Sequence, residues 1–183
     1  MNKWNTLKGK YPFRLGTTSY IIPADIVPNV RYLADKVDDI ELVLFESDEL
    51  ANIPSPDVVA ELDTLARDND LTYTIHLPLD IHTGHAEEAE RSKSVEKCLY
   101  IIDRMAPLNP AGYLLHLDGD QRGGVPSENL PRWQANHRRS ISELIAHVAA
   151  GKLCVETLDY PYDLVTDIVT ELGTAVCLDI GHL

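Results

Sequence analysis

The chain has 183 residues, of which 44% are hydrophobic, so it is long enough to bury the core of one folded domain and does not fit the disordered class. Its 16 basic and 29 acidic side chains give a formal net charge of −13, which disfavours duplex nucleic acid as a partner, because that binding depends on Lys and Arg contacts to phosphates. No apolar run approaches the roughly 20 residues of a membrane span, the N-terminal segment lacks the apolar core of a secretory signal, and the three cysteines have no CxxC spacing. We therefore expect a cytoplasmic protein that does not bind membranes.

Short β-rich runs alternate along the chain with longer segments of helical periodicity. Six strands are predicted, at residues 14–22, 39–46, 72–78, 113–119, 152–158 and 175–183. Five helical segments are predicted between them, at residues 23–37, 55–69, 87–105, 128–151 and 161–173. Strict alternation of strand and helix is typical of a parallel sheet.

The side-chain alternation within the predicted strands favours a barrel over an open sheet. In the strand at 72–78 one face is apolar and the other ends in His76, and the later strands repeat this pattern. In the last strand the apolar face consists of Val176, Leu178 and Ile180. An open sheet with helices on both sides would be apolar on both faces. The pattern predicts a (β/α)8 TIM barrel, in which the apolar faces pack under helices and the polar strand ends gather at the C-terminal mouth.

The number of predicted strands is smaller than a whole barrel requires. A (β/α)8 barrel needs about 250 residues, so residues 1–183 are interpreted as a single domain made of the first six βα units, with the last two units absent. Such a domain leaves its first and sixth strands unpaired and exposes apolar surface. We expect this chain to self-associate, or to be a piece of a longer ordered chain, and to bind metal weakly.

Polar side chains recur at the C-terminal ends of the predicted strands. They are His76, His116, Glu156 and Asp179, followed by His182, with Glu46 at the end of the second strand. In a closed barrel these groups would converge, and imidazole with carboxylate is a ligand set for Zn²⁺, Mn²⁺ or Fe²⁺. A single residue of this kind is usually a satisfied polar group, but four together would leave buried charge uncompensated without a cation. The pattern predicts a divalent-metal site.

The other histidines fit simpler roles. His82 and His85 belong to a polar loop and are interpreted as solvated, whereas His137 and His147 fall in a helical segment and are interpreted as surface or packing residues. The sequence contains neither a G-x-G-x-x-G motif after a strand nor a P-loop, so no nucleotide cofactor is expected.

Four motifs resemble those of the xylose-isomerase-like barrel superfamily, which includes endonuclease IV and the sugar-phosphate isomerases and epimerases. They are IHLP (75–78), LLHLDGD (114–120), CVETLD (154–159) and CLDIGHL (177–183). Their order is more similar to the endonuclease IV branch. That resemblance implies that His76 and His116 hold one metal, that Glu156 bridges to a second, and that Asp179 and His182 hold the second and a third. In the epimerases, only the positions of Glu156 and Asp179 bind metal.

The roles of individual residues follow from this resemblance. It implies that the catalytic residues are Glu156, Asp179 and His182, and that Glu46 contacts the substrate. The superfamily takes its remaining ligands from a region after strand seven, which has no counterpart in these 183 residues.

A narrower resemblance suggests a substrate. Residues 13–47 and HLPLD (76–80) are similar to the cobamide-remodelling phosphodiesterases, which hydrolyse the phosphodiester of the cobamide nucleotide loop. The implied function is a divalent-metal-dependent phosphodiester hydrolase that acts on a small molecule. Two alternatives stay open. One is a sugar or sugar-phosphate isomerase or epimerase with one metal at Glu156 and Asp179, and the other is an inactive fragment or a binding module.

Overall fold

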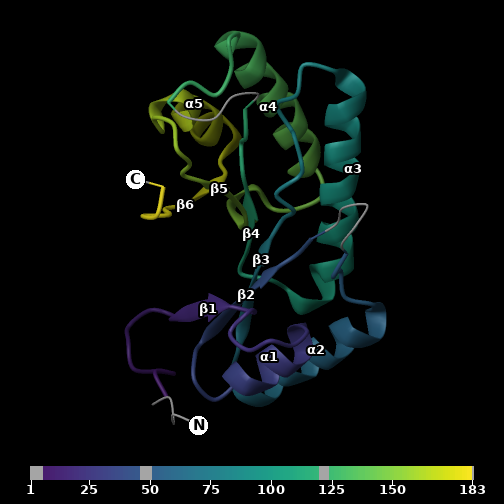
Figure 1. The fold of residues 1–183 in the computed structure, drawn as a ribbon, viewed down its shortest axis with the longest axis vertical. Helices are drawn as coiled ribbons and strands as arrows, with labels where there is room; N and C mark the ends of the chain where they lie inside the picture. The colour runs from purple at the N-terminus through teal and green to yellow at the C-terminus, as the bar shows by residue number, and fades with distance from the viewer. Residues whose placement is uncertain (1–5, 46–50, 120–123, 183) are drawn as a thin grey trace. The chain divides into compact units, whose positions relative to one another are not determined.

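The computed structural model describes residues 6–45, 51–119 and 124–182, which form two compact units. The first unit contains the chain up to residue 76 together with residues 104–111, and the second contains residues 77–103 and those from 112 onward. Strands and helices alternate along the whole described chain (Figure 1). This alternation confirms the predicted α/β class, whereas the interpretation of residues 1–183 as a single domain stays a prediction.

The first unit carries a parallel three-stranded arrangement. Its elements are β1 (Gly16–Thr18), α1 (Ile26–Leu33), β2 (Asp39–Val43), α2 (Pro56–Asn69), β3 (Thr72–His76) and a short 3-10 helix, η1 (Ala106–Leu108). Strand β2 pairs in parallel with both β1 and β3, and α1 and α2 lie side by side. Helix α2 begins where the Ser55 hydroxyl accepts a hydrogen bond from the Val58 amide, with Pro56 in the first turn, and it ends at Asp70, whose φ of 48° is left-handed.

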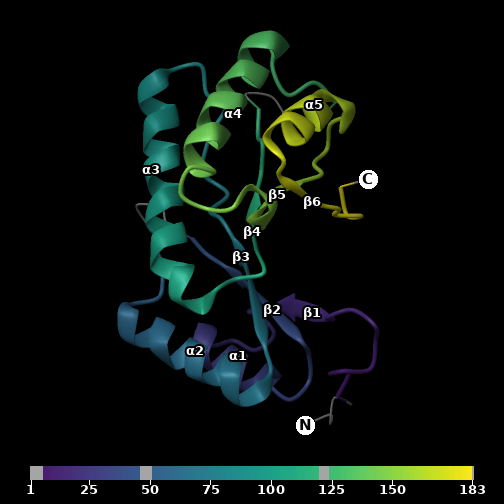
Figure 2. The ribbon, with the colours of Figure 1, turned by 180° about the vertical axis from the view of Figure 1, so that it is seen from behind.

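The second unit repeats this arrangement and carries most of the candidate site. Its elements are α3 (Glu88–Met105, whose last residues belong to the first unit), β4 (Gly112–Leu115), α4 (Leu130–Leu144), the 3-10 helix η2 (Ala150–Lys152), β5 (Leu153–Glu156), α5 (Asp163–Leu172) and β6 (Ala175–Cys177). Strand β5 pairs in parallel with β4 and β6, and α4 contacts α5 (Figure 2). Its core is built from side chains such as Leu115, Val155 and Ile168, all of which are fully buried.

All six predicted strands are present, but each ends earlier than the sequence pattern suggested. Strand β4 ends at Leu115 and β6 at Cys177, so His116 and Asp179 lie in the turns just after their strands. His76 and Glu156 are the last residues of β3 and β5. The polar groups therefore mark the points at which the backbone leaves the sheet, where loops can turn a side chain toward a site.

The expectation that the apolar face of the last strand packs beneath a helix is wrong. Val176, Leu178 and Ile180 are 47%, 65% and 80% exposed. Among the described residues of this unit, β6 pairs only with β5, and no helix follows it. An apolar face is buried only when another element covers it, and none of the residues described up to 182 covers these three side chains.

No helix in the described ranges combines the length and the hydropathy that crossing a membrane would require.

Candidate metal centre

Three ligand-type side chains meet where β5 and β6 end. The ligand atoms of Glu156, Asp179 and His182 all lie within 4.8 Å of one another. Glu156 is buried, Asp179 is half-buried and His182 is exposed, so the group opens to solvent on one side. Two carboxylates and an imidazole are donors that Zn²⁺, Mn²⁺ and Fe²⁺ accept, so the residues fit a divalent ion.

Thr157 holds the turn after β6 against the end of β5. Its amide donates to the Cys177 carbonyl at 3.0 Å, and its hydroxyl accepts from the Asp179 amide at 2.9 Å. The parallel register pairs Glu156 with Cys177. Because Thr157 follows Glu156 directly and bonds Asp179 through the backbone, it sets the spacing between the two carboxylates. Thr157 is a positioning residue that the sequence pattern did not single out.

The segment from Asp179 to His182 forms a tight turn that brings the side chains of Asp179 and His182 close together. The Gly181 amide donates to Asp179 Oδ1 at 2.7 Å, and His182 Nε2 lies 3.6 Å from Asp179 Oδ2. The pKa of Asp179 is lowered, chiefly by the Gly181 hydrogen bond and also by the nearby His182 and His116. Asp179 therefore stays ionised at neutral pH, as a metal ligand must.

His116 extends the group to a second imidazole. Its Nε2 lies 3.1 Å from Glu156 Oε2, its Nδ1 lies 3.9 Å from Asp118 Oδ2, and its ring faces that of His182 edge-on at 6.3 Å. Burial acts to lower the pKa of His116, but the hydrogen bond to Glu156 and the surrounding carboxylates outweigh burial and raise it. Glu156 thus favours the protonated form of His116, and an ion bound at its Nε2 would compete with that proton.

Two predicted site residues remain, His76 and Glu46. His76 ends β3 in the first unit, where it is half-buried and pairs in register with Val43. Its role as a metal ligand stays a prediction. Glu46, predicted to contact the substrate, lies outside the described residues.

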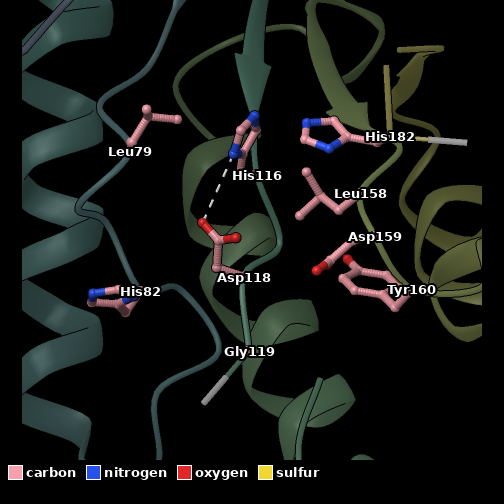
Figure 3. Close-up of a pocket in the computed structure, with 9 residues that line it drawn as sticks. All are labelled: Leu79, His82, His116, Asp118, Gly119, Leu158, Asp159, Tyr160 and His182. Atoms are coloured by element: carbon pink, nitrogen blue, oxygen red, sulfur yellow. Dashed lines mark ion pairs between the residues drawn. The ribbon is translucent and has the colours of Figure 1, made fainter. Parts of the chain in front are cut away.

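A cavity of about 390 Å³ adjoins the candidate metal centre within the second unit, with His116 and His182 in its lining. Its lining comprises Leu79, His82, His116, Asp118, Gly119, Leu158, Asp159, Tyr160 and His182 (Figure 3). His82 is exposed, as expected of a loop residue, but the loop brings it to the cavity wall. Asp118 and Asp159 are further cavity residues that sequence reasoning missed. The signal that could have found them is their position two and three residues past His116 and Glu156, in loops at the C-terminal ends of strands.

A family model described as xylose isomerase-like TIM barrel matches residues 33–183. The chain belongs to this family. This membership confirms the predicted fold class and the superfamily resemblance. No curated protein sequence matches the chain.

Solved structures similar to this chain include epimerases and an endonuclease. A D-tagatose 3-epimerase-like protein has a TM-score of 0.73 and 19% identity, with 93% of this chain and 66% of that chain covered. A 3-keto-D-glucoside 4-epimerase from E. coli has a TM-score of 0.68 and 16% identity, with 91% and 68% covered. Endonuclease IV from Thermus thermophilus has a TM-score of 0.66 and 17% identity, with 93% and 64% covered. The chain thus spans about two thirds of these proteins, and at such identities the likeness shows the fold alone.

Buried aromatic residues fix the cavity loops of this barrel unit. The Tyr160 hydroxyl donates to the Leu117 carbonyl at 2.9 Å, and Trp133 Nε1 donates to the Asp118 carbonyl at 3.0 Å. The two rings meet edge-on at 5.6 Å. Burial, together with the charges of Asp118 and Asp159, raises the pKa of Tyr160, so its hydroxyl keeps its proton and remains a donor. The loops after β4 and β5 are therefore held by the core of the unit.

Side chains from α4 and α3 hold the loop that carries His82. Ser140 Oγ donates to the Thr83 carbonyl at 2.8 Å, and both Asn136 and Arg91 donate to the His85 carbonyl. His137 Nδ1 lies 3.0 Å from the Thr83 hydroxyl. Because these groups are buried, the loop is tied to the helices through its backbone.

Proposed function

We propose that the protein is a divalent-metal-dependent phosphodiester hydrolase whose substrate is a small molecule, a cobamide. The bond that it would cleave is the phosphodiester of the cobamide nucleotide loop. The observation that carries the proposal is the contact between His116 and Glu156 at 3.1 Å. Glu156 therefore contacts His116 and also belongs to the group that contains Asp179 and His182. Two imidazoles and one further carboxylate around the buried Glu156 suit a site that holds more than one ion, as the resemblance to endonuclease IV implies.

The residues would have different roles: the carboxylates would retain the ions by their charge, and the imidazoles would hold a proton or contact the substrate. A bound divalent ion supplies Lewis acidity at a phosphoryl oxygen and lowers the pKa of water. Glu156 and Asp179 supply the negative charge that retains such ions. His116 can hold a proton at Nε2 until an ion replaces it, and His182, exposed at the cavity wall, is placed to contact the substrate.

The choice of a small phosphodiester rests on charge and on resemblance. A net charge of −13 opposes a polyanionic partner, whereas one phosphodiester carries a single negative charge that the ions can bind. The similarity of residues 13–47 and 76–80 to the cobamide-remodelling phosphodiesterases supports the cobamide as that molecule.

A sugar epimerase is the second candidate, and one observation favours it. The cavity presents two carboxylates, Asp118 and Asp159, that could accept hydrogen bonds from sugar hydroxyls. The similar structures also include an epimerase-like protein and an epimerase. In that reaction, carboxylates move a proton next to a carbonyl. It needs one ion at Glu156 and Asp179 and no metal contact from His116.

One experiment separates the two functions. The protein is loaded in turn with Zn²⁺, Mn²⁺, Fe²⁺ and Co²⁺ and incubated with adenosylcobalamin, and mass spectrometry follows the loss of the nucleotide-loop base. We expect cleavage with at least one metal and none with Glu156→Gln. Metal analysis of His116→Asn, with His147→Asn as the control, should show the loss of one ion. Intact cobamide with all four metals, together with unchanged metal content in His116→Asn, would overturn the hydrolase proposal.

A further inference from the structure

We infer that His82 is a substrate-binding residue, which holds a sugar ring or a heterocyclic base of the substrate on the side of the cavity away from the candidate metal centre. The inference rests on the proposed function, because it takes the scissile phosphodiester to be bound at the metal centre and the neighbouring group to fill the cavity. It gives His82 a role beyond that of the solvated loop residue that the sequence pattern predicts.

The loop that carries His82 lies between β3 and α3 and has no regular secondary structure, yet side chains of α3 and α4 fix its backbone. The His82 amide donates to Ser94 Oγ at 2.9 Å. Every backbone carbonyl from residue 83 to residue 86 also accepts a hydrogen bond from a side chain of these helices. The donors are Ser140 to Thr83, Asn136 to Gly84 and His85, Arg91 to His85 and Ala86, and Arg132 to Ala86. The loop is therefore held in place before any ligand binds.

Holding this loop takes many of the buried polar side chains of the protein. Six of those found among the described residues belong to the loop or contact it, namely Thr83, Arg91, Ser94, Asn136, His137 and Ser140. A loop that only connects two elements runs over the surface, where water satisfies its backbone, and burying polar groups costs free energy unless they are hydrogen-bonded. A loop that binds a ligand gains from being fixed, because less conformational entropy is lost on binding.

The fixed backbone directs the His82 side chain into the cavity. Ile81 and Thr83, on either side of it, are each 1% exposed, whereas His82 is exposed and lines the cavity. Figure 3 shows His82 and Leu79 on one side of the cavity and His182 on the other. A ligand that fills the cavity from the metal centre therefore meets His82 at its other end.

The chemistry of this side of the cavity selects the kind of group that binds. The ring nitrogens of His82 can donate or accept a hydrogen bond, and the Leu79 side chain, 52% exposed, offers apolar surface on the same side. A sugar ring or a heterocyclic base combines a carbon framework with oxygen or nitrogen atoms at its edge, so it matches this pair of side chains. A cavity of about 390 Å³ is near the lower end of ligand sites and suits one such unit. In a nucleotide-loop phosphodiester, a sugar is attached directly to the phosphoryl group.

Chemical modification of the histidines tests the contact directly. Diethyl pyrocarbonate modifies accessible imidazoles, and mass spectrometry of the peptides gives the rate at each histidine. The metal-loaded protein is modified alone, with adenosylcobalamin in large excess, so that the compound stays saturating, and with D-fructose, a ketose of the class that an epimerase would bind. We expect saturation to slow the modification of His82 at least about fivefold and to leave that of His147, an exposed histidine just after α4, unchanged.

Substitutions separate a contact with the substrate from a structural role of the loop. His82→Ala should raise KM for the cobamide about tenfold and change kcat less than about twofold, because a contact made equally in the ground state and the transition state affects binding alone. His82→Gln keeps a hydrogen-bonding group and should restore part of the affinity. Both variants should keep the metal content and the thermal unfolding of the unaltered protein, as should the control His147→Ala. Ser140→Ala, which frees the Thr83 carbonyl, should also raise KM, whereas Ser142→Ala on the same helix should not.

The inference and the proposed function fail in different ways. Cleavage of the cobamide with an unchanged KM in His82→Ala, and with equal modification of His82 in the presence and absence of the compound, would overturn the inference and leave the proposed function standing. Protection of His82 by either compound without cleavage would refute the hydrolase proposal and support the inference. Modification of His82 that neither compound slows would overturn the inference whether or not the cobamide is cleaved.

Discussion

Replacing His137 with Gln is expected to change how the stability of the protein depends on pH. His137 lies on α4 and is 0% exposed. Its Nδ1 contacts the Thr83 hydroxyl, and its ring meets Trp133 edge-on at 4.4 Å. The backbone of Gly84 approaches so closely that a β-carbon there would lie 2.2 Å from His137 Nε2. None of these three contacting groups is charged, so burial lowers the pKa of His137 to about 3.

The sign of the effect follows from comparing the folded and unfolded chains. In the unfolded chain a histidine titrates at a pKa of about 6.5. Above that pH His137 is neutral in both states and adds no pH dependence. As the pH falls below 6.5, the unfolded chain binds a proton and the folded chain does not until about pH 3, so stability is lost across this window. Between pH 7.5 and pH 5.0 the loss amounts to about 2 kcal/mol, from about 1.5 pH units at about 1.36 kcal/mol each.

Urea unfolding followed by far-UV circular dichroism at the two pH values measures this loss. Between pH 7.5 and pH 5.0, the free energy of unfolding of the unaltered protein should fall by about 2 kcal/mol more than that of His137→Gln. His147→Gln, which removes an exposed histidine just after the same helix, should behave like the unaltered protein. The comparison is made within each variant, so any packing cost of the substitution cancels. An equal loss in the unaltered protein and in His137→Gln would refute the argument that His137 is buried and neutral.

Three further predictions concern packing, metal binding and association. Gly84→Ala should lower the free energy of unfolding by about 1–3 kcal/mol, because the added methyl group overlaps the buried His137 ring. Gly151→Ala should leave it unchanged, because no neighbouring atom lies within 4 Å of the new carbon. Thermal unfolding measures both variants. Asp179→Asn should lower the metal content of the loaded protein at neutral pH by one ion, as measured by mass spectrometry, and full retention would remove Asp179 from the ligands. The exposed apolar side chains of β6 and of the residues just after it should cause self-association, which light scattering would detect and Leu178→Lys should weaken; a monomer at all concentrations would contradict this.

The sequence by itself determined the order of the elements and the positions of ligand-type side chains at the strand ends. Hydrophobic periodicity and caps such as Ser55 are local properties, so the alternation of six strands with helices could be predicted from them. The polar residues at strand ends, Glu156 and Asp179 among them, could likewise be identified from their register. The confirmed superfamily resemblance rests on the same local motifs.

The tertiary structure alone decided which other side chains share the site and which apolar surface is covered. Asp118 and Asp159 reach the cavity because hydrogen bonds from distant residues fix their loops, such as that from Trp133 to the Asp118 carbonyl, 15 residues away in sequence. His137 is neutral because burial removes water from its ring, and burial depends on the packing of separate elements. The exposed face of β6 has the same apolar pattern as the buried strands, since a pattern states which face can be buried but not whether another element covers it.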